Sequence, residues 1–258
     1  MRTIPGERWS GPPLEPETLG YGMGLDLGQA SDYTALVVVE AVSVLTGEPE
    51  TVQEDAILAA FAHRPPRTFT RPGRRIEHHV VHLERMRGKP YPEIVARTGD
   101  VVEQVIANHR IKVTLPPGHD PLIQRTPDPP LPLLMVDATG VGRPVLDMVR
   151  QAGMPAEIRG ATITGGDAVT TEGWDVRVPK RDLVSAVLRL LQEGRLKWGV
   201  RLPLRAELEA ELRTFRARIT PAAHEVYGAW REGEHDDLVL ALALACWGLE
   251  FVPGAPVG

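Results

Sequence analysis

The sequence predicts an α/β fold, in which helices cover both faces of a mixed β-sheet. Two strand candidates come first, over residues 21–27 and 34–44, and a tight link over residues 28–32 joins them. Further along the chain, strand and helix candidates alternate, which is the order expected for a layered α/β domain. We find no internal repeat and no second segment with a core of its own.

The first half of the sequence supplies most of the strand candidates. The two opening strands are rich in apolar and β-branched residues. A third candidate covers residues 51–62, and weak alternation around Val80 and His82 indicates another strand or an exposed edge. Between them, residues 64–75 are basic and contain proline, so we expect a loop there. Residues 91–108 then place apolar side chains at helical spacing.

The second half begins with the most apolar strand candidate. Residues 133–136 form a continuous apolar run that ends at Asp137, which is typical of a strand buried on both faces. A helix is predicted over residues 144–152 and a strand over residues 157–164. Residues 164–175 are rich in Gly and Thr and indicate a flexible loop or hairpin.

Three helices are predicted in the last third of the sequence. Residues 180–193 are amphipathic, and Gly194 ends that helix. Residues 204–215 form a second helix. The third starts at His235 and contains the apolar run 238–247, which is half the length that a membrane span needs and therefore indicates a buried helix.

Length and composition indicate one sizeable core. The chain has 258 residues, of which 43% are hydrophobic. We assign residues 1–20 to an irregular leader or linker, residues 21–250 to one domain and residues 251–258 to a tail. The single cysteine, Cys246, excludes an intramolecular disulfide framework, and no Cys/His cluster has the spacing of a zinc site.

The formal net charge of −5 argues against a protein that holds nucleic acid by bulk charge alone. It does not argue against a nuclease, because a site built from carboxylates attracts phosphate only after cations have bound.

Four aspartates stand out because the pattern places them at the edge of the core. Asp26 lies within the apolar first strand, Asp137 ends the buried strand, and Asp236 and Asp237 begin the apolar last helix. A carboxylate in such a position is costly to ionise without a partner. A bound divalent cation would relieve all four together, and hard cations such as Mg²⁺ and Mn²⁺ prefer oxygen ligands.

Phosphodiester hydrolysis fits this set of acids. Two cations about 3.5–4 Å apart can activate a water and stabilise the leaving 3′ oxygen. Each acid also has a structural interpretation: Asp26 as a turn residue, Asp137 as a cap, and Asp236 with Asp237 as an N-cap and first-turn pair. The shared metal site is favoured because it accounts for all four together.

Four segments resemble the nuclease domain at the C-terminal end of phage terminase large subunits. They are GLDLGQASDYTAL at 24–36, LMVDATGVG at 134–142, ITGG with VPKRDLV at 163–166 and 178–184, and HDDLVLALALA at 235–245. The resemblance implies a ribonuclease-H-like fold and endonuclease activity that cuts duplex DNA during phage genome packaging. It implies that Asp26, Asp137 and Asp237 bind two Mg²⁺ or Mn²⁺ ions, with Asp236 as a neighbouring acid that ranks slightly below Asp237.

The resemblance also implies partners and a location. Terminase large subunits carry an ATPase motor, but this sequence contains no Gly-x-x-x-x-Gly-Lys-Ser/Thr phosphate loop. We therefore expect a separate ATPase motor, a small terminase subunit or a portal protein as partner, double-stranded DNA as substrate, no membrane, and the cytoplasm of the host bacterium as location.

Several basic residues are accessory candidates. His235 could orient water or phosphate, and Lys180, at the start of a helix, could meet a phosphate there. In the basic segment, Arg71, Arg74 and Arg75 are candidate contacts to DNA phosphates, since arginine suits phosphate geometry. Each has a structural alternative: His235 as a helix-start residue, and the lysine and the arginines as solvated surface residues.

Two other functions remain open. A Holliday-junction resolvase would use a similar acidic set on branched DNA. An actin-like or sugar-kinase-like ATP-binding protein also has an Asp-x-Gly hairpin followed by Thr, but we find no second phosphate loop after Asp137.

Overall fold

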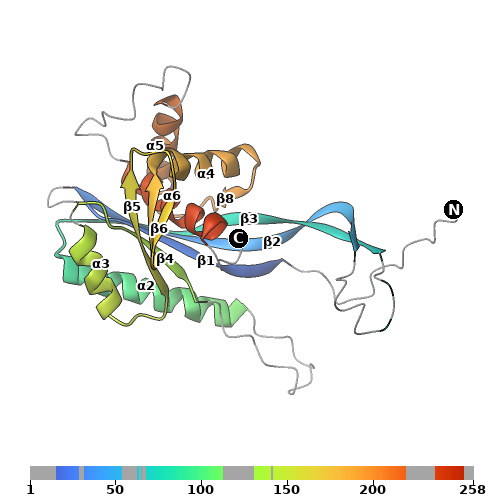
Figure 1. The fold of residues 1–258 in the computed structure, drawn as a ribbon, viewed down its shortest axis with the longest axis horizontal. Coiled ribbons are helices and arrows are strands. Elements are labelled where there is room, and N and C mark those ends of the chain that lie inside the picture. Colours follow the sequence, from blue (N-terminus) through green and yellow to red (C-terminus); the bar gives the residue numbers. More distant parts are fainter. Residues whose placement is uncertain are drawn as a thin grey trace. The chain divides into compact units, whose positions relative to one another are not determined.

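A mixed eight-stranded sheet organises the protein, in the order β6-β7-β5-β4-β1-β2-β3-β8 (Figure 1). The computed structural model describes residues 16–28, 32–53, 68–112, 131–140, 142–218 and 236–252, together with residues 63 and 65. Strand β4 runs parallel to β1 and β5, and β5 runs parallel to β7, whereas β6 and β7 are antiparallel. The α/β class that the sequence predicts is confirmed.

The described helices and strands have the following bounds: β1 (Glu17–Asp26), β2 (Tyr33–Gln53), β3 (Thr68–Arg87), α2 (Tyr91–Lys112), β4 (Leu133–Asp137), α3 (Gly142–Gln151), β5 (Glu157–Thr164), β6 (Thr170–Glu172), β7 (Asp175–Pro179), α4 (Lys180–Gln192), β8 (Leu196–Trp198), α5 (Arg205–Arg218) and α6 (Asp237–Phe251).

The chain forms two compact units. One consists of residues 1–18 and 42–77, and the other of residues 19–41 and 78–258. In the first unit, β2 and β3 approach each other closely at Gly73. A Cβ on this glycine would lie only 2.6 Å from the carbonyl oxygen of Glu48. The second unit contains the helices and the main core.

Helices cover both faces of the sheet in the larger unit, with α2 and α3 on one side and α4, α5 and α6 on the other (Figure 1). The period-two alternation of β1 explains how it serves both layers. Tyr21, Met23 and Leu25 belong to the core cluster that includes residues of α2 and α3. The alternate residues, Gly22 and Gly24, point to α6.

Glycines in β1 let α6 pack directly on the sheet. A Cβ on Gly24 would lie 1.9 Å from the carbonyl oxygen of Ala241, and one on Gly22 would lie 2.7 Å from that of Ala245. Helix α6 is apolar around its whole circumference, which is the pattern of a buried helix. Within the described residues, no helix combines the length and apolar character needed to cross a membrane.

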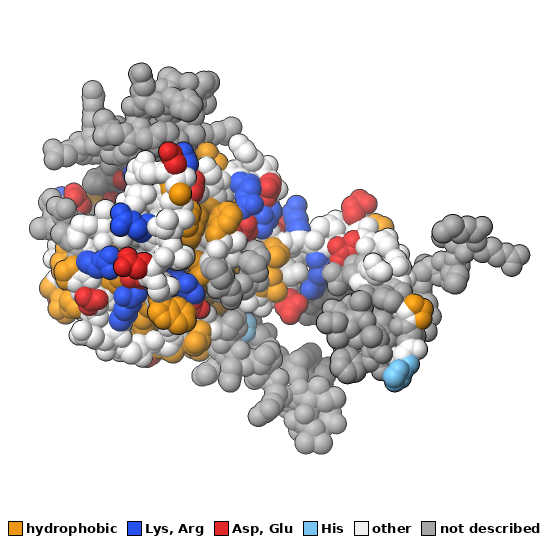
Figure 2. Space-filling view, viewed as in Figure 1, with side chains coloured by type: hydrophobic (Ala, Val, Ile, Leu, Met, Phe, Trp, Pro, Cys, Tyr) orange, Lys and Arg blue, Asp and Glu red, His pale blue; other side chains and the backbone are white. Residues whose placement is uncertain are grey.

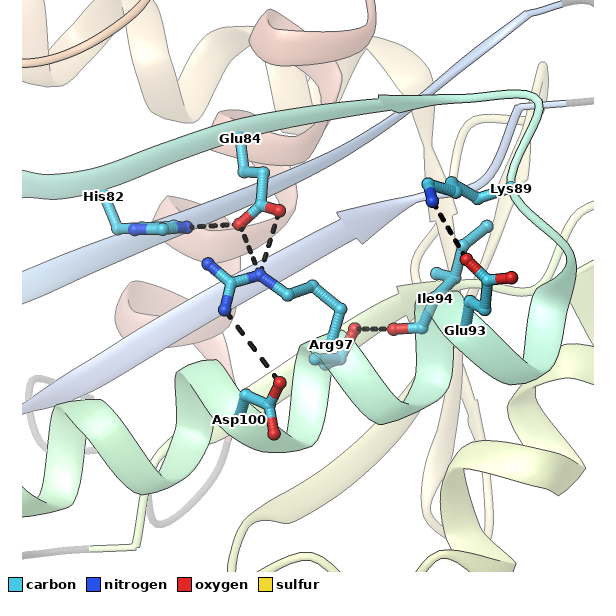
Figure 3. Close-up of polar contacts among 8 residues, drawn as sticks. His82, Glu84, Lys89, Glu93, Ile94, Arg97 and Asp100 are labelled. Atoms are coloured by element: carbon cyan, nitrogen blue, oxygen red, sulfur yellow. Dashed lines mark hydrogen bonds and ion pairs between the residues drawn. The ribbon is translucent and has the colours of Figure 1, made fainter.

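Ion pairs hold α2 against β3 (Figure 3). The guanidinium Nε of Arg97 donates to both carboxylate oxygens of Glu84, at 2.9 and 3.0 Å, and His82 Nε2 lies 3.1 Å from the same carboxylate. Burial tends to raise the pKa of Glu84, but these hydrogen bonds outweigh it and lower that pKa. Arg85, next to Glu84 in β3, reaches the opposite layer of helices.

Several predicted boundaries are wrong. Strand β1 begins at Glu17, inside the range assigned to an irregular leader, and α6 ends at Phe251, the first residue of the predicted tail. Residues 34–44 and the start of the predicted strand 51–62 belong to one strand, β2. The basic segment 64–75, expected to be a loop, is strand from Thr68 onward. Pairing between β2 and β3 overrides the loop signal of Pro72 in this segment.

Figure 2 shows how charge is distributed on one face of the described surface. Lysine and arginine side chains are interspersed with aspartate and glutamate, and hydrophobic side chains lie between them. Among the described residues, no single sign of charge covers this face.

Candidate acidic active site

Asp26 and Asp137 end two neighbouring parallel strands. The register pairs Gly24 with Met135 and Leu25 with Val136, so the next residues along the two strands are the two aspartates. Both side chains lie on the α6 side, because Gly24 and Met135 are in close contact with α6 and the strands alternate. The two carboxyl groups lie close enough for each to influence the pKa of the other.

Asp237 reaches the same place from α6. Residues four apart lie on one stripe of a helix, and the stripe that starts at Asp237 continues with Ala241 and Ala245. Ala241 packs on Gly24 and Ala245 on Gly22. Asp237 lies one helical turn before Ala241 on this stripe. Asp26 is the next residue after Gly24 on the same face of β1. The packing of Ala241 on Gly24 therefore brings Asp237 and Asp26 toward each other.

Asp236 points to a different partner. It precedes the first residue of α6, and consecutive helical residues point about 100° apart. Its Oδ2 lies 3.8 Å from Nζ of Lys180, the first residue of α4. The structure thus separates the two neighbouring acids: Asp237 continues the stripe that packs on β1, and Asp236 is paired with α4.

The carboxylates are too crowded to be ionised together easily. The side chain of Asp26 is buried, with 8% of the residue exposed. Its pKa is raised well above the ordinary value, first by burial and then by repulsion from Asp137, Asp237 and Asp236. Burial also raises the pKa of Asp137, although hydrogen bonds with Thr139 oppose the shift. Added positive charge in the cluster would favour the ionised forms.

The turn after β4 holds Asp137 in place. The backbone N–H of Thr139 donates to Oδ1 of Asp137 at 2.8 Å, and the Thr139 hydroxyl accepts from the N–H of Ile163 at 2.9 Å. Gly140 has a φ of +59°, which favours glycine, and a Cβ on Gly142 would lie 2.0 Å from the carbonyl oxygen of Asp137. The Gly residues that follow Asp137 in the sequence are thus required by this turn.

Two basic side chains lie close to the acids, Lys180 at the start of α4 and Arg85 in β3. Burial lowers the pKa of Lys180, and the attraction of Asp236, Asp26 and Asp137 opposes that shift. On β3, Arg85 lies 3.4 Å from Oδ2 of Asp237 and also pairs with Glu211 of α5.

Glu211 connects Arg85 to the start of α6. Its Oε2 accepts a hydrogen bond from the N–H of Val239 at 3.1 Å. Neither Arg85 nor Glu211 is predicted from the sequence. Arg85 lies in a weakly alternating strand and Glu211 in a helix with many charges, so neither carries a local signal.

The donor chemistry of the cluster fits a hard divalent cation, because every acidic ligand offers carboxylate oxygen. Among the described residues, however, no three His, Cys, Asp or Glu side chains surround one point at metal-ligand distances. Oδ1 of Asp137 is bound to Thr139, and Asp237 to Arg85. To bind one cation together, the carboxylates would have to rotate toward a common point.

The remaining predicted residues lie elsewhere or outside the described part. His235 and the side chain of Arg71 lie outside it. Arg74 pairs with Glu17 at 3.1 Å, and Arg75 donates to Glu77 at 3.0 Å through Nε. Contact of these arginines with DNA stays a prediction.

Comparison with known proteins gives matches among solved structures alone. No protein-family model matches this sequence, and no curated protein does. The large terminase nuclease from thermophilic phage G20c is 18% identical with a TM-score of 0.43, covering 88% of this chain and 80% of its own. The same nuclease with bound cobalt is 19% identical, with the same TM-score and coverage.

The human cytomegalovirus terminase nuclease domain, Mn soaked and inhibitor bound, is 13% identical with a TM-score of 0.45, covering 90% of this chain and 83% of that chain. These structural neighbours are terminase nucleases. At such low identity, the roles of Asp26, Asp137 and Asp237 have to follow from the geometry of this chain.

Proposed function

We propose that this protein is a metal-dependent DNA endonuclease of the terminase large-subunit type. The observation that carries the proposal is the meeting of Asp26, Asp137 and Asp237. They come from two strands and a helix, they lie on one face of the sheet, and burial raises the pKa of Asp26 and Asp137. A fold has little reason to gather carboxylates in this way unless cations bind them.

In this proposal, Asp26, Asp137 and Asp237 hold two Mg²⁺ or Mn²⁺ ions, and Asp236 assists. When bound, the ions would supply an activated water and stabilise the leaving 3′ oxygen of phosphodiester hydrolysis. The N–H of Thr139 orients Asp137. Lys180 would attract a bound phosphate with its positive charge. It is close to the acids, because Asp236, Asp26 and Asp137 all influence its pKa.

The wider role follows from the sequence resemblance. We propose that the substrate is double-stranded DNA, cut during phage genome packaging in the cytoplasm of the host bacterium. A separate ATPase motor, a small terminase subunit or a portal protein would deliver the DNA.

A plasmid-nicking assay with Mn²⁺ or Mg²⁺ at low salt tests this function. We expect the wild type to nick the plasmid. The nicking rate of Asp26→Asn, Asp137→Asn and Asp237→Asn should be at least about 100-fold lower, as when a group that stabilises the transition state is removed. Asp236→Asn should lose less, because Asp236 pairs with Lys180. Asp100→Asn is the matched control, since Asp100 is an exposed aspartate of α2.

The outcomes separate the alternatives. A wild type that stays inert over a range of metal and salt, or aspartate variants that cut as well as wild type, would rule out the assignment. Faster cleavage of a four-way junction than of linear duplex would favour the resolvase, and ATP turnover without cleavage would favour the ATP-binding alternative.

A further inference from the structure

Two arginines of β3 lie against one aromatic ring beside the acids. The guanidinium carbon of Arg85 is 5.1 Å from the ring centroid of Tyr33, and that of Arg87 is 5.3 Å from it. Residues two apart in a strand share a face. Because Arg85 reaches Asp237, that shared face is the face of the acidic cluster.

The two arginines differ in their exposure. The side chain of Arg85 is 14% exposed and lies between the carboxylates of Glu211 and Asp237. Arg87 is exposed and lies two residues further along β3. A phosphate chain that approaches a cluster of carboxylates is repelled by them, and an exposed arginine next to the cluster would offset part of that repulsion.

We propose that Arg87, held against Tyr33, binds a phosphate of the DNA strand next to the bond that is cut, and thereby guides the strand to the acids. This inference rests on the proposed function, because the duplex is taken to be the substrate. A cation–π contact engages the face of the guanidinium, whereas phosphate oxygens accept from N–H groups at its edge, so one group can do both.

Tyr33 is well placed to support such a contact. It is the first residue of β2, directly after the link from Asp26 and β1. The link is tied to β2 by the N–H of Gly28, which donates to the hydroxyl of Thr34 at 3.2 Å. The ring that carries Arg87 is therefore anchored to the strand end that carries Asp26.

Duplex binding by a non-cutting protein tests the inference. Fluorescence anisotropy of a labelled duplex is measured with Asp26→Asn as the background, without divalent cation, from about 50 to 200 mM salt. We expect Arg87→Ala to weaken binding about tenfold and to lower the slope of log K against log salt by about 0.9, the value for one phosphate contact.

Conservative variants separate charge from geometry. Arg87→Lys should keep the salt slope and lose part of the affinity, because lysine cannot form the bidentate contact. Tyr33→Leu should weaken binding, whereas Tyr33→Phe, which keeps the ring, should not. Arg177→Ala is the matched control: Arg177 is exposed on β7, which β5 and β4 separate from β1.

An equal loss of duplex affinity in Arg87→Ala and Arg177→Ala would overturn the inference, because it would show that the duplex is attracted by overall charge and not by a contact at Arg87. An unchanged affinity in Arg87→Ala, or no duplex binding at any salt, would overturn it as well. Neither result depends on cleavage. If wild type failed to nick DNA while Arg87→Ala alone lost binding, the proposed nuclease would be wrong and the phosphate contact would stand.

Discussion

Replacing Gly24 with alanine tests the packing that brings the acids together. The added Cβ would lie 1.9 Å from the carbonyl oxygen of Ala241 and 3.0 Å from the backbone nitrogen of Ala245. All of the nearest atoms belong to the backbone of α6, so no side chain can rotate away. Helix α6 and strand β1 must separate by about 1 Å to bring the shortest contact to 3.0 Å.

The separation should cost stability and activity together. Overpacking a core typically costs about 1–3 kcal/mol, and we expect a loss of about 3 kcal/mol of unfolding free energy, because this clash is between backbones. Asp237 moves with α6, away from Asp26. A misplacement of about 1 Å in a catalytic constellation costs about 100-fold in rate, so nicking by the folded variant should fall by that factor.

Chemical denaturation and plasmid nicking measure the two effects. The matched control is Gly99→Ala in α2, where the added Cβ meets nothing within 4 Å. Alanine is a better helix former than glycine, so the unfolding free energy of this variant should rise by up to about 1 kcal/mol, and the variant should cut DNA normally. If the unfolding free energy of Gly24→Ala is within about 0.5 kcal/mol of the wild-type value and the variant nicks DNA at the full rate, α6 does not pack on β1 as described.

Two further predictions concern pH and metal. His78 is fully buried, and burial lowers its pKa from 6.5 to about 4. The unfolded chain therefore binds the proton first, so unfolding free energy should be highest above pH 6.5 and fall by up to about 3 kcal/mol as the pH drops to 4. Denaturation midpoints of wild type and His78→Leu across this range measure the effect, and parallel curves would contradict it. Second, Mn²⁺ at about 100 times its Kd should stabilise the protein by about 3 kcal/mol. Excess EDTA should reverse the gain, and the same stabilisation in Asp26→Asn would speak against Asp26 as a ligand.

Much of the architecture can be predicted from the sequence because its signals are local. Alternation in residues 21–27 and the apolar run before Asp137 mark strands, and the helical spacing after Lys180 marks α4. The acids at the ends of these elements are visible for the same reason. Strand β8 was missed, since three residues are too few to show a period.

Tertiary structure decides which side chains meet. Arg85 and Glu211 are 126 positions apart, and only the placement of β3 beside α5 and α6 pairs them. The choice between Asp237 and Asp236 depends on which stripe of α6 faces Gly22 and Gly24, which no helical pattern reveals when the helix is apolar all round. Periodicity identifies elements and the face that each one buries, whereas the chemistry of the cluster depends on register and helix rotation, which arise when the elements pack.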